Sequence, residues 1–398
     1  MKRLCPTGTA TGSDMKITGA EFYIVRLPKR REHTWASNTK LTIGRHVLVR
    51  LLTDEGVDGW GEAPALPTWG GANGRYYGET AETVAHLGKD HLVPAIVGCD
   101  PQHIATIHAR MDAVVKGNPY AKAAIDIACF DAAGKALGLP VWAMLGGKHR
   151  EGVLIAHSLG LMPIEQCVEE AQAAVADGAR TIKVKTGKDA RRDIEVVAKL
   201  REVLGSDVQI RVDGNEGYTT PHEAITVTRA QEEYDILLCE QPVAGLKALA
   251  RVAAGVNTPV MADESAWNAL DIVELDAANA AACYSLYVTK PGGLYRARQQ
   301  AEIAAALGMY SDIGGSIEMG IGNAANLHLG VAMPTAWLPS VCPMTTVAGI
   351  PGPSTACVYY TDDVVIQPFR FQDGMLLPPD GPGLGVEVDM DKVKAYSD

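Results

Sequence analysis

The stretch Thr181-Ile182-Lys183-Val184-Lys185 is the first of several short apolar segments that each end in an ionisable residue. The later segments end at Asp213, Glu240, Asp263 and Lys290. Counted by subtraction from residue 185, these positions follow at intervals of about 28, 27, 23 and 27 residues, roughly one strand-loop-helix-loop unit of a (β/α) barrel. Side chains that end successive strands of such a barrel share one rim. The spacing therefore predicts a barrel with its functional site at the carboxyl ends of the strands.

Both lysines of the first segment, Lys183 and Lys185, point to one face of a strand because side chains alternate. Buried lysines are costly unless they lie among carboxylates, so we expect them at the barrel mouth. The alternative is a solvated edge strand, which the apolar flanks argue against. The same alternation places Arg211, Asp213 and Asn215 on one face of the next segment, where an ordinary Asp-Gly-Asn turn is the alternative.

Three carboxylates, Asp213, Glu240 and Asp263, end successive predicted strands, and Glu264 follows the last of them directly. Carboxylate oxygens are ligands that Mg²⁺ prefers, whereas zinc takes His or Cys. We therefore predict a Mg²⁺ site, in which Mn²⁺ could substitute. A further carboxylate, Glu318, follows the seventh predicted strand and could act from behind the metal ligands.

Lys290 ends the sixth predicted strand, which in a closed barrel lies roughly across from the second. Lys185 and Lys290 could then flank one substrate carbon from opposite faces and act as acid and base. The structural alternative for Lys290 is a Lys-Pro loop in contact with solvent. A functional alternative is a barrel lyase that uses Lys185 or Lys290 to form a Schiff base.

The chain outside this stretch predicts a second domain. Strand patterns at 16–27, 46–52 and 57–63 precede helical patterns at 79–89, 102–115 and 120–137, the order of an α+β domain. We expect residues 1–14 to be a loose extension, residues 15–145 to form a capping domain completed by residues 365–398, and residues 146–364 to form the barrel. A weaker strand pattern at 337–342 would be the eighth strand.

Composition narrows the function classes. The 398 residues carry a net charge of −11, which argues against nucleic acid and anionic membranes as partners. The sequence lacks an apolar run of the roughly 18 residues that a membrane span needs. The 8 cysteines show no paired spacing, which favours a reducing cytoplasm over a disulfide framework.

With these residues in place, the chain resembles the enolase superfamily and, within it, the muconate-lactonizing-enzyme subgroup. Lys183-Val184-Lys185 is similar to the subgroup's K-x-K, and Lys290 in Lys-Pro-Gly-Gly is similar to its opposite lysine. The resemblance implies a modified TIM barrel, (β/α)₇β, with an N-terminal α+β capping domain, in the α/β class. It also implies Mg²⁺ held by the three carboxylates, a small carboxylate substrate, proton transfer next to that carboxylate through an enolate, and a homo-oligomer.

The same resemblance leaves the reaction open between a muconate-like cycloisomerase, which we favour narrowly, and a racemase or epimerase of N-acylated or otherwise N-substituted amino acids. The resemblance also implies that two capping loops determine the substrate specificity, here residues 28–40 and 62–78. The substrate-binding candidates in these loops are Arg30, Arg31, Trp35, Trp69 and Tyr76.

Overall fold

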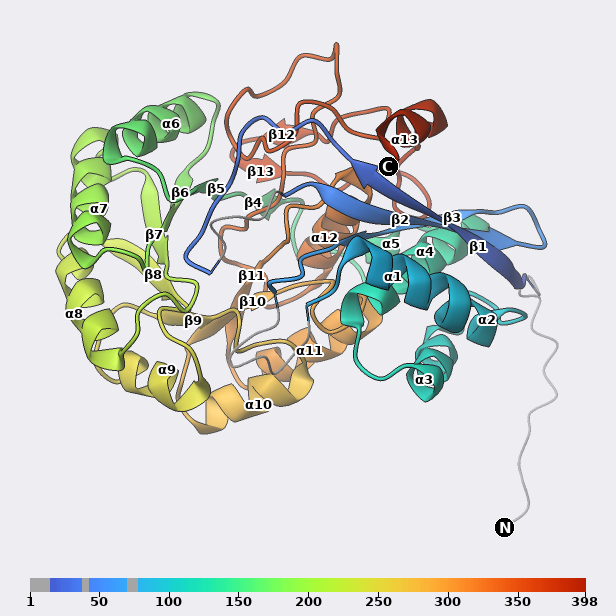
Figure 1. The fold of residues 1–398 in the computed structure, drawn as a ribbon, viewed down its shortest axis with the longest axis horizontal. Helices are drawn as coiled ribbons and strands as arrows, with labels where there is room; N and C mark the ends of the chain where they lie inside the picture. The colour runs from blue at the N-terminus through green and yellow to red at the C-terminus, as the bar shows by residue number, and fades with distance from the viewer. Residues whose placement is uncertain (1–14, 38–42, 70–77) are drawn as a thin grey trace.

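The computed structural model describes residues 15–37, 43–69 and 78–398. A small layer of three strands and several helices lies beside a curled parallel sheet with helices on its outside (Figure 1). The strands are β1 (Ile17–Arg26), β2 (Arg45–Thr53), β3 (Gly59–Pro64), β4 (Val153–Leu154), β5 (His157–Leu159), β6 (Thr181–Lys185), β7 (Gln209–Asp213), β8 (Ile236–Glu240), β9 (Val260–Ala262), β10 (Cys283–Leu286), β11 (Tyr310–Ile313), β12 (Phe371–Gln372) and β13 (Met375–Leu376). The helices are α1 (Ala81–Leu87), the π-helical turn η2 (Gly88–Leu92), α2 (Val93–Ile96), α3 (Ile104–Val114), α4 (Pro119–Leu137), α5 (Val141–Met144), α6 (Ile164–Ala176), α7 (Ala190–Leu204), α8 (Pro221–Glu232), α9 (Leu246–Ala253), α10 (Ala269–Ala277), α11 (Leu294–Ala306), α12 (Gly320–Ala332) and α13 (Met390–Tyr396).

The N-terminal sheet is an antiparallel meander with the order β1-β2-β3. The turn between β2 and β3 is closed by Thr53, whose hydroxyl donates to the carbonyl of Val57 over 2.8 Å and accepts its N–H over 3.1 Å. The predicted meander is confirmed, and its strand ends differ from the prediction by up to two residues.

Helix α4 packs directly against β3. The close approach depends on two glycines: a Cβ on Gly59 would lie 1.9 Å from the carbonyl oxygen of Ala128, and one on Gly61 would lie 1.8 Å from that of Ala124. Gly138, with a φ of +67°, ends the helix as the sequence predicts. This contact packs α4 directly onto the meander at the side of the barrel.

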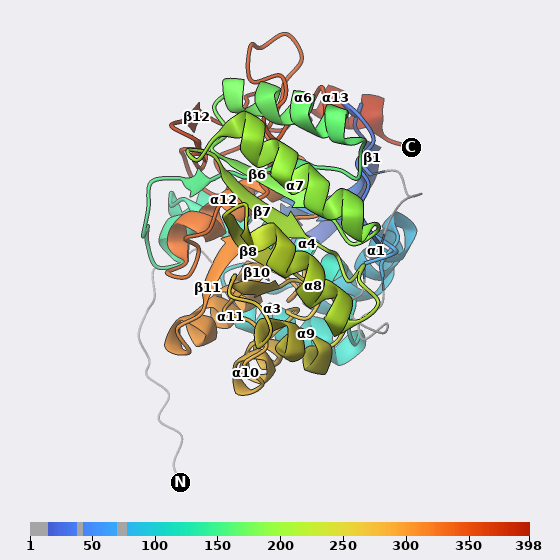
Figure 2. The same ribbon diagram turned by 90° about the vertical axis from the view of Figure 1, so that its left-hand side faces the viewer.

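The parallel sheet has the order β11-β10-β9-β8-β7-β6-β5, and the helices that connect its strands line its outer face (Figure 2). Residues 335–340 take the eighth position by bridging Ser311 to Ala336 on one side and Ile155 to Ser340 on the other. The prediction of an eighth strand near residues 337–342 holds only in part, because the segment takes the eighth position through isolated bridges at Ala336 and Ser340 rather than as a strand. Pro339 lacks the N–H that a continuous ladder needs, which explains the irregular backbone.

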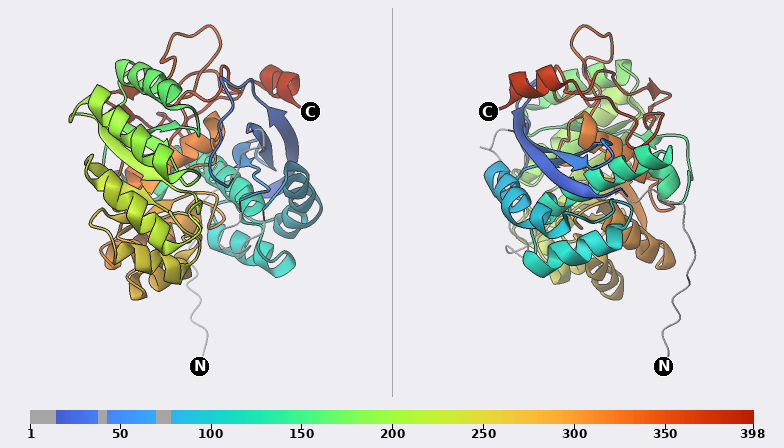
Figure 3. Two further views of the ribbon diagram at one scale, coloured as in Figure 1. Left: turned by 60° about the vertical axis from the view of Figure 1, so that its left-hand side comes forward. Right: turned by 90° about the vertical axis from the view of Figure 1, so that its right-hand side faces the viewer.

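The C-terminal segment returns to the N-terminal layer, as expected for residues 365–398. Val25 of β1 forms a bridge with Ser397, and Arg45 pairs with Asp398 over 2.7 Å. Figure 3 shows α13 beside β1 at one end of the molecule. On the way, β12 and β13 form a small sheet with β4. The exact domain limits stay a prediction.

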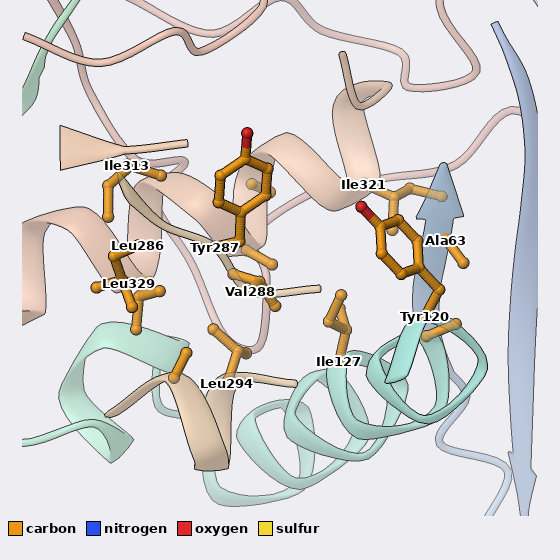
Figure 4. Packing of buried hydrophobic residues seen from close by; sticks show 14 of the residues in the cluster. Ala63, Tyr120, Ile127, Leu286, Tyr287, Val288, Leu294, Ile313, Ile321 and Leu329 are labelled. Carbon is orange, nitrogen blue, oxygen red and sulfur yellow. The ribbon is translucent and has the colours of Figure 1, made fainter. Parts of the chain in front are cut away.

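One hydrophobic core joins the two layers. Tyr120 and Ile127 of α4 lie in the same buried cluster as Leu286 of β10 and Ile313 of β11. Figure 4 shows these side chains with Leu294, Ile321 and Leu329 between the helix and the strands. The shared core fixes α4 against the barrel. In the described residues, no helix is long and apolar enough to cross a membrane.

Candidate active site

Four of the predicted side chains meet at the carboxyl ends of three adjacent strands. In the parallel register, Lys185 of β6 is beside Asp213 of β7, which is beside Glu240 of β8. Register partners point to the same side of a sheet, and Lys183 shares the face of Lys185. All four side chains are buried.

Lys183 lies between two carboxylates. Its Nζ is 2.8 Å from Oε1 of Glu240 and 2.9 Å from Oδ2 of Asp213. Burial alone would lower the pKa of this lysine, but the two carboxylates outweigh burial and raise its pKa above the ordinary value. Lys183 is therefore a fixed positive charge at the mouth.

Lys185 contacts the same carboxylate oxygen of Asp213 as Lys183 does. Its Nζ donates to Oδ2 of Asp213 over 2.6 Å and to Oδ1 of Asn215 over 2.7 Å. Asn215 has a φ of +42°, and its N–H donates to Oδ1 of Asp213 over 2.9 Å. The Asp-Gly-Asn segment thus forms a turn that also orients the lysine. Burial would raise the pKa of Asp213, but the two lysines outweigh it and lower that pKa.

Lys290 does not end a strand, contrary to the prediction. Strand β10 ends at Leu286, and Lys290 lies in the following turn, where the N–H of Gly293 donates to the carbonyl of Val288 over 2.8 Å. The lysine Nζ donates to Oδ1 of Asp263 over 2.8 Å and to the carbonyl of Asp263 over 2.9 Å. It also lies 4.1 Å from the centre of the Tyr287 ring. The turn places Lys290 on the β9–β10 side of the mouth.

Arg211 points into the barrel interior below the mouth. Its guanidinium pairs with Oε2 of Glu240 and, over 2.8 Å, with Oδ2 of Asp312. Burial opposes its charge, but the two carboxylates outweigh burial and raise the pKa of Arg211 further. Arg211 thus orients Glu240 from beneath rather than lining the pocket.

The predicted supporting carboxylates are buried and incompletely bonded. Oε1 of Glu264 accepts from Nδ2 of Asn215 over 3.0 Å, and its Oε2 has no partner among the described residues. Burial, followed by the charges of Asp263 and Asp213, raises the pKa of Glu264 well above its usual value. Glu318 accepts from the N–H of Ser316 over 3.0 Å, and burial raises its pKa to about 7.

A pocket opens above these groups. Trp35 and Trp69 line it, as expected for capping-loop residues. Its other lining residues are His33, Leu66, Ser158, Lys183, Lys185, Asn215, Asp263, Tyr287, Asp312, Gly314, Gly315, Ser316, Ile317, Val341 and Tyr359. From the sequence, His33 was expected only as one of the capping-loop cations able to receive a second carboxylate, and Ser158, Tyr287 and Tyr359 were not predicted as site residues. The alternation of His33 with Trp35 was a signal for the histidine, whereas Tyr359 had none.

Arg30 and Arg31 are not brought to the pocket. Both guanidinium groups contact Oε1 of Glu170 on α6, over 2.6 and 2.7 Å. They attach the first capping loop to the barrel, and their role in substrate binding stays a prediction. Tyr76, the last predicted contact, lies outside the described residues.

Asp213, Glu240 and Asp263 fit Mg²⁺ in donor chemistry, since all offer buried carboxylate oxygens. The ammonium of Lys183 touches the first two, so these can reach a common cation. Asp263 instead contacts Lys290 and Tyr287. Across residues 15–37, 43–69 and 78–398, no group of three His, Cys, Asp or Glu side chains is arranged to hold a metal ion. The three-carboxylate metal site stays a prediction.

The chain matches two family profiles. Residues 20–146 match the mandelate racemase/muconate lactonizing enzyme N-terminal domain, and residues 166–392 match the enolase C-terminal domain-like family. Members of this family typically use a divalent metal ion.

Among known relatives, the chain is 30% identical to an N-succinyl-L-Arg/Lys racemase of Bacillus cereus over 96% of this chain and 97% of that protein. It is 33% identical to muconate cycloisomerase 1 of Rhodococcus opacus over 97% and 99%. A muconate lactonizing enzyme from Pseudomonas fluorescens, solved in complex with muconolactone, superposes with a TM-score of 0.87 at 28% identity, covering 96% of this chain and 99% of that one. The two sequence relatives have different substrates at similar identity. The chain therefore belongs to the mandelate racemase/muconate lactonizing enzyme family and is an enzyme of the enolase superfamily, whose relatives here are isomerases and racemases.

Proposed function

We propose that this enzyme moves a proton on the carbon next to a substrate carboxylate and that it racemises an N-acylated amino acid. The observation that carries the proposal is the placement of two lysines. Lys185 ends β6 and Lys290 follows β10, and these strands are four positions apart in the sheet order. In a ring of eight positions they lie on opposite sides of the mouth, which supports their acting on the two faces of one carbon. Lys185 lines the pocket, whereas Lys290 is buried against Asp263 and Tyr287 and is not among the lining residues, so its ammonium must turn toward the pocket to act.

Each lysine has its own carboxylate partner, Asp213 for Lys185 and Asp263 for Lys290. One lysine in its neutral form accepts the α-proton, and the other in its ammonium form donates a proton to the opposite face. Repeating the two steps in the reverse direction converts the other enantiomer. Lys183 keeps its positive charge and stabilises negative charge that develops on the substrate carboxylate.

Asp213, Glu240 and Asp263 would hold the divalent cation. When bound, such an ion supplies Lewis-acid stabilisation for the negative charge on the substrate oxygens.

The pocket wall favours a substrate with one carboxylate and an apolar or amide portion. Among the described residues, Lys183 and Lys185 are the cationic side chains in the pocket lining, while the nearby guanidinium groups are paired with Glu170. Trp35, Trp69, Tyr287 and Tyr359 offer apolar surface in the pocket lining. A second carboxylate, as in muconate, would have no separate cation in this part of the wall.

Cycloisomerisation of a muconate-like dicarboxylate is the second candidate, and the reaction that the sequence patterns favour narrowly. The 33% identity to a muconate cycloisomerase supports it. This reaction needs one acid/base lysine on one face, and either Lys185 or Lys290 could serve.

Proton NMR in deuterium oxide separates the two reactions. We expect the Mg²⁺-supplied enzyme to exchange the α-proton of N-succinyl and N-acetyl amino acids with inversion and to leave cis,cis-muconate unchanged. Consumption of muconate without exchange on any N-acylated amino acid would overturn the racemase proposal in favour of the second candidate.

A further inference from the structure

His33 lies in the pocket wall with both ring nitrogens placed by neighbours. It is 3% exposed, and its Nδ1 is 3.2 Å from Nη1 of Arg31. Its Nε2 is 3.5 Å from Oγ of Ser158, longer than an ordinary hydrogen bond. The ring also meets Tyr359 edge-on, with centroids 5.4 Å apart. The ring orientation is thus fixed while the Nε2 side stays weakly bonded.

The contact with Arg31 determines the tautomer. A guanidinium carries only donors, so Nδ1 must accept, and a neutral imidazole then carries its proton on Nε2. In an imidazolium, the Nδ1–H of His33 would point at the Nη1–H of Arg31, and neither could accept. Burial is the largest cause that lowers the pKa of His33 well below its usual value, and the charges of Arg31, Lys185 and His157 add to it, against Glu170. The ring is therefore neutral at pH 7.

Arg31 is itself held by the barrel. Its Nε and Nη2 contact Oε1 of Glu170 over 3.0 and 2.7 Å, and its Nη1 donates to the carbonyl of Glu32 over 2.8 Å. Glu170 lies on α6, so a barrel helix sets the donor that a capping-loop histidine presents. Arg31 and Glu170 are positioning residues in this arrangement.

The donor lies close to the reacting groups. Ser158 on β5 is the register partner of Lys183 on β6, so the His33–Ser158 pair borders the mouth directly. Both residues line the same pocket as Lys183 and Lys185. A substrate whose carboxylate lies near Lys183 can place a second polar group, a few bonds away, at this pair.

We propose that His33 donates a hydrogen bond from Nε2 to the acyl carbonyl oxygen of the substrate and thereby selects N-acylated amino acids. This inference rests on the proposed function, because it names the part of the substrate that the site recognises. A neutral donor beside Trp35 and Tyr359 suits an uncharged carbonyl better than a second carboxylate, which would lose its hydration without gaining a cation there.

The ring nitrogens can be observed directly. In the ¹⁵N-labelled full chain, the His33 signal is identified by its loss in His33→Gln. We expect a neutral ring protonated on Nε2, and a downfield shift of that proton when N-acetyl amino acid is added. An imidazolium at pH 7, a proton on Nδ1, or no response to the amino acid would overturn the inference. A response to muconate alone would mean that the acceptor is a carboxylate, which also overturns it.

Kinetics test whether the proposed hydrogen bond from His33 discriminates between substrates. For an N-acetyl amino acid, we expect His33→Phe to raise KM by about tenfold or more with a smaller change in kcat, because a buried acceptor loses its donor. His33→Gln should restore part of the loss. With the N-thioacetyl analogue, a poor acceptor of similar shape, wild type and His33→Phe should differ little; equal losses on both substrates would mean a structural role and contradict the inference.

Failure of the proposed function is distinguishable from failure of this inference. If the enzyme turns over no N-acylated amino acid but the Nε2 proton still responds to its binding, the racemase proposal fails and the donor assignment stands. If turnover occurs and the proton does not respond, the donor assignment fails alone.

Discussion

Arg211 is a fully buried charge beneath the site. It joins Glu240, a predicted metal ligand, to Asp312, and all three side chains are buried. Removing one partner of a buried network leaves the other charges uncompensated. The orientation of Glu240 therefore depends on a residue that never faces the pocket.

Arg211→Leu tests this dependence. We expect the free energy of unfolding to fall by about 3–5 kcal/mol, measured by urea unfolding, because Asp312 loses its cation and Glu240 keeps only Lys183 of its two. Arg298→Leu is the control, since Arg298 pairs with Glu302 on the surface and such pairs contribute about 0–1 kcal/mol. Equal losses for the two variants would contradict a structural role for Arg211.

At this scale the sequence predicted the contacts that follow strand register and missed those that do not. Lys185, Asp213 and Glu240 meet because neighbouring parallel strands align them. By contrast, the guanidinium of Arg31 pairs with Glu170, which is 139 residues away in the sequence and lies on a helix. No local sequence pattern predicts that pair.

Helix α4 is one of the elements that link the capping layer to the barrel. Its side chains share the core of β10 and β11, and its backbone approaches β3 at Gly59 and Gly61. The sequence predicted the helix and its end at Gly138. It did not predict that Gly59 and Gly61 allow the close approach, because the local pattern does not show which element packs against β3.

Gly61→Ala should destabilise the fold. Its new methyl group would meet the carbonyl oxygen of Ala124 at 1.8 Å, so we expect a loss of about 1–3 kcal/mol or more in urea unfolding. Gly19→Ala in β1 is the matched control, because no atom lies within 4 Å of its added carbon. A loss at position 61 no greater than that at position 19 would rule out the tight contact.

Glu79 makes the start of α4 sensitive to pH. It accepts the N–H groups of Tyr120 and Ala121 over 2.7 and 3.2 Å, and burial raises its pKa from 4.5 to about 7. Between these values the native state keeps a proton that the unfolded state releases, so this contribution to stability is complete below about pH 4.5 and is lost as the pH rises through about 7.

Glu79→Gln should remove that loss. Relative to its own value at pH 4.5, the variant should gain up to roughly 3 kcal/mol over wild type by pH 7.5 in urea unfolding. Glu195→Gln, at an exposed position of α7, is the control and should follow wild type. Parallel curves for Glu79→Gln and wild type would mean that Glu79 does not titrate in this range.

Across the whole molecule, the sequence predicted a capping layer over a curled parallel sheet, and the comparison with solved muconate lactonizing enzymes agrees. The backbone at the eighth position of the sheet could not be predicted from the local sequence. Residues 335–340 close the ring there through isolated bridges, which depend on both neighbouring segments. The direction of the capping-loop side chains Arg30 and Arg31 could not be predicted, because the sequence shows that they are charged but not that they pair with Glu170.

The predicted metal site can be tested by removing divalent cations from the enzyme. Removal of divalent ions with EDTA should abolish α-proton exchange, measured by NMR, and Mg²⁺ or Mn²⁺ should restore it. Glu240→Gln should resist restoration at the same ion concentration. Full activity in EDTA would contradict the assignment of the three carboxylates.

The most direct test of the central claim is enantiomer-specific exchange by single-lysine variants. With Lys185→Met and Lys290→Met supplied with Mg²⁺ in deuterium oxide, we expect racemisation to fall by about a hundredfold or more, while each variant still exchanges the α-proton of one enantiomer, the opposite one in each case. If both variants keep exchanging the same enantiomer, or if either racemises as fast as wild type, the two lysines do not address opposite faces of one carbon.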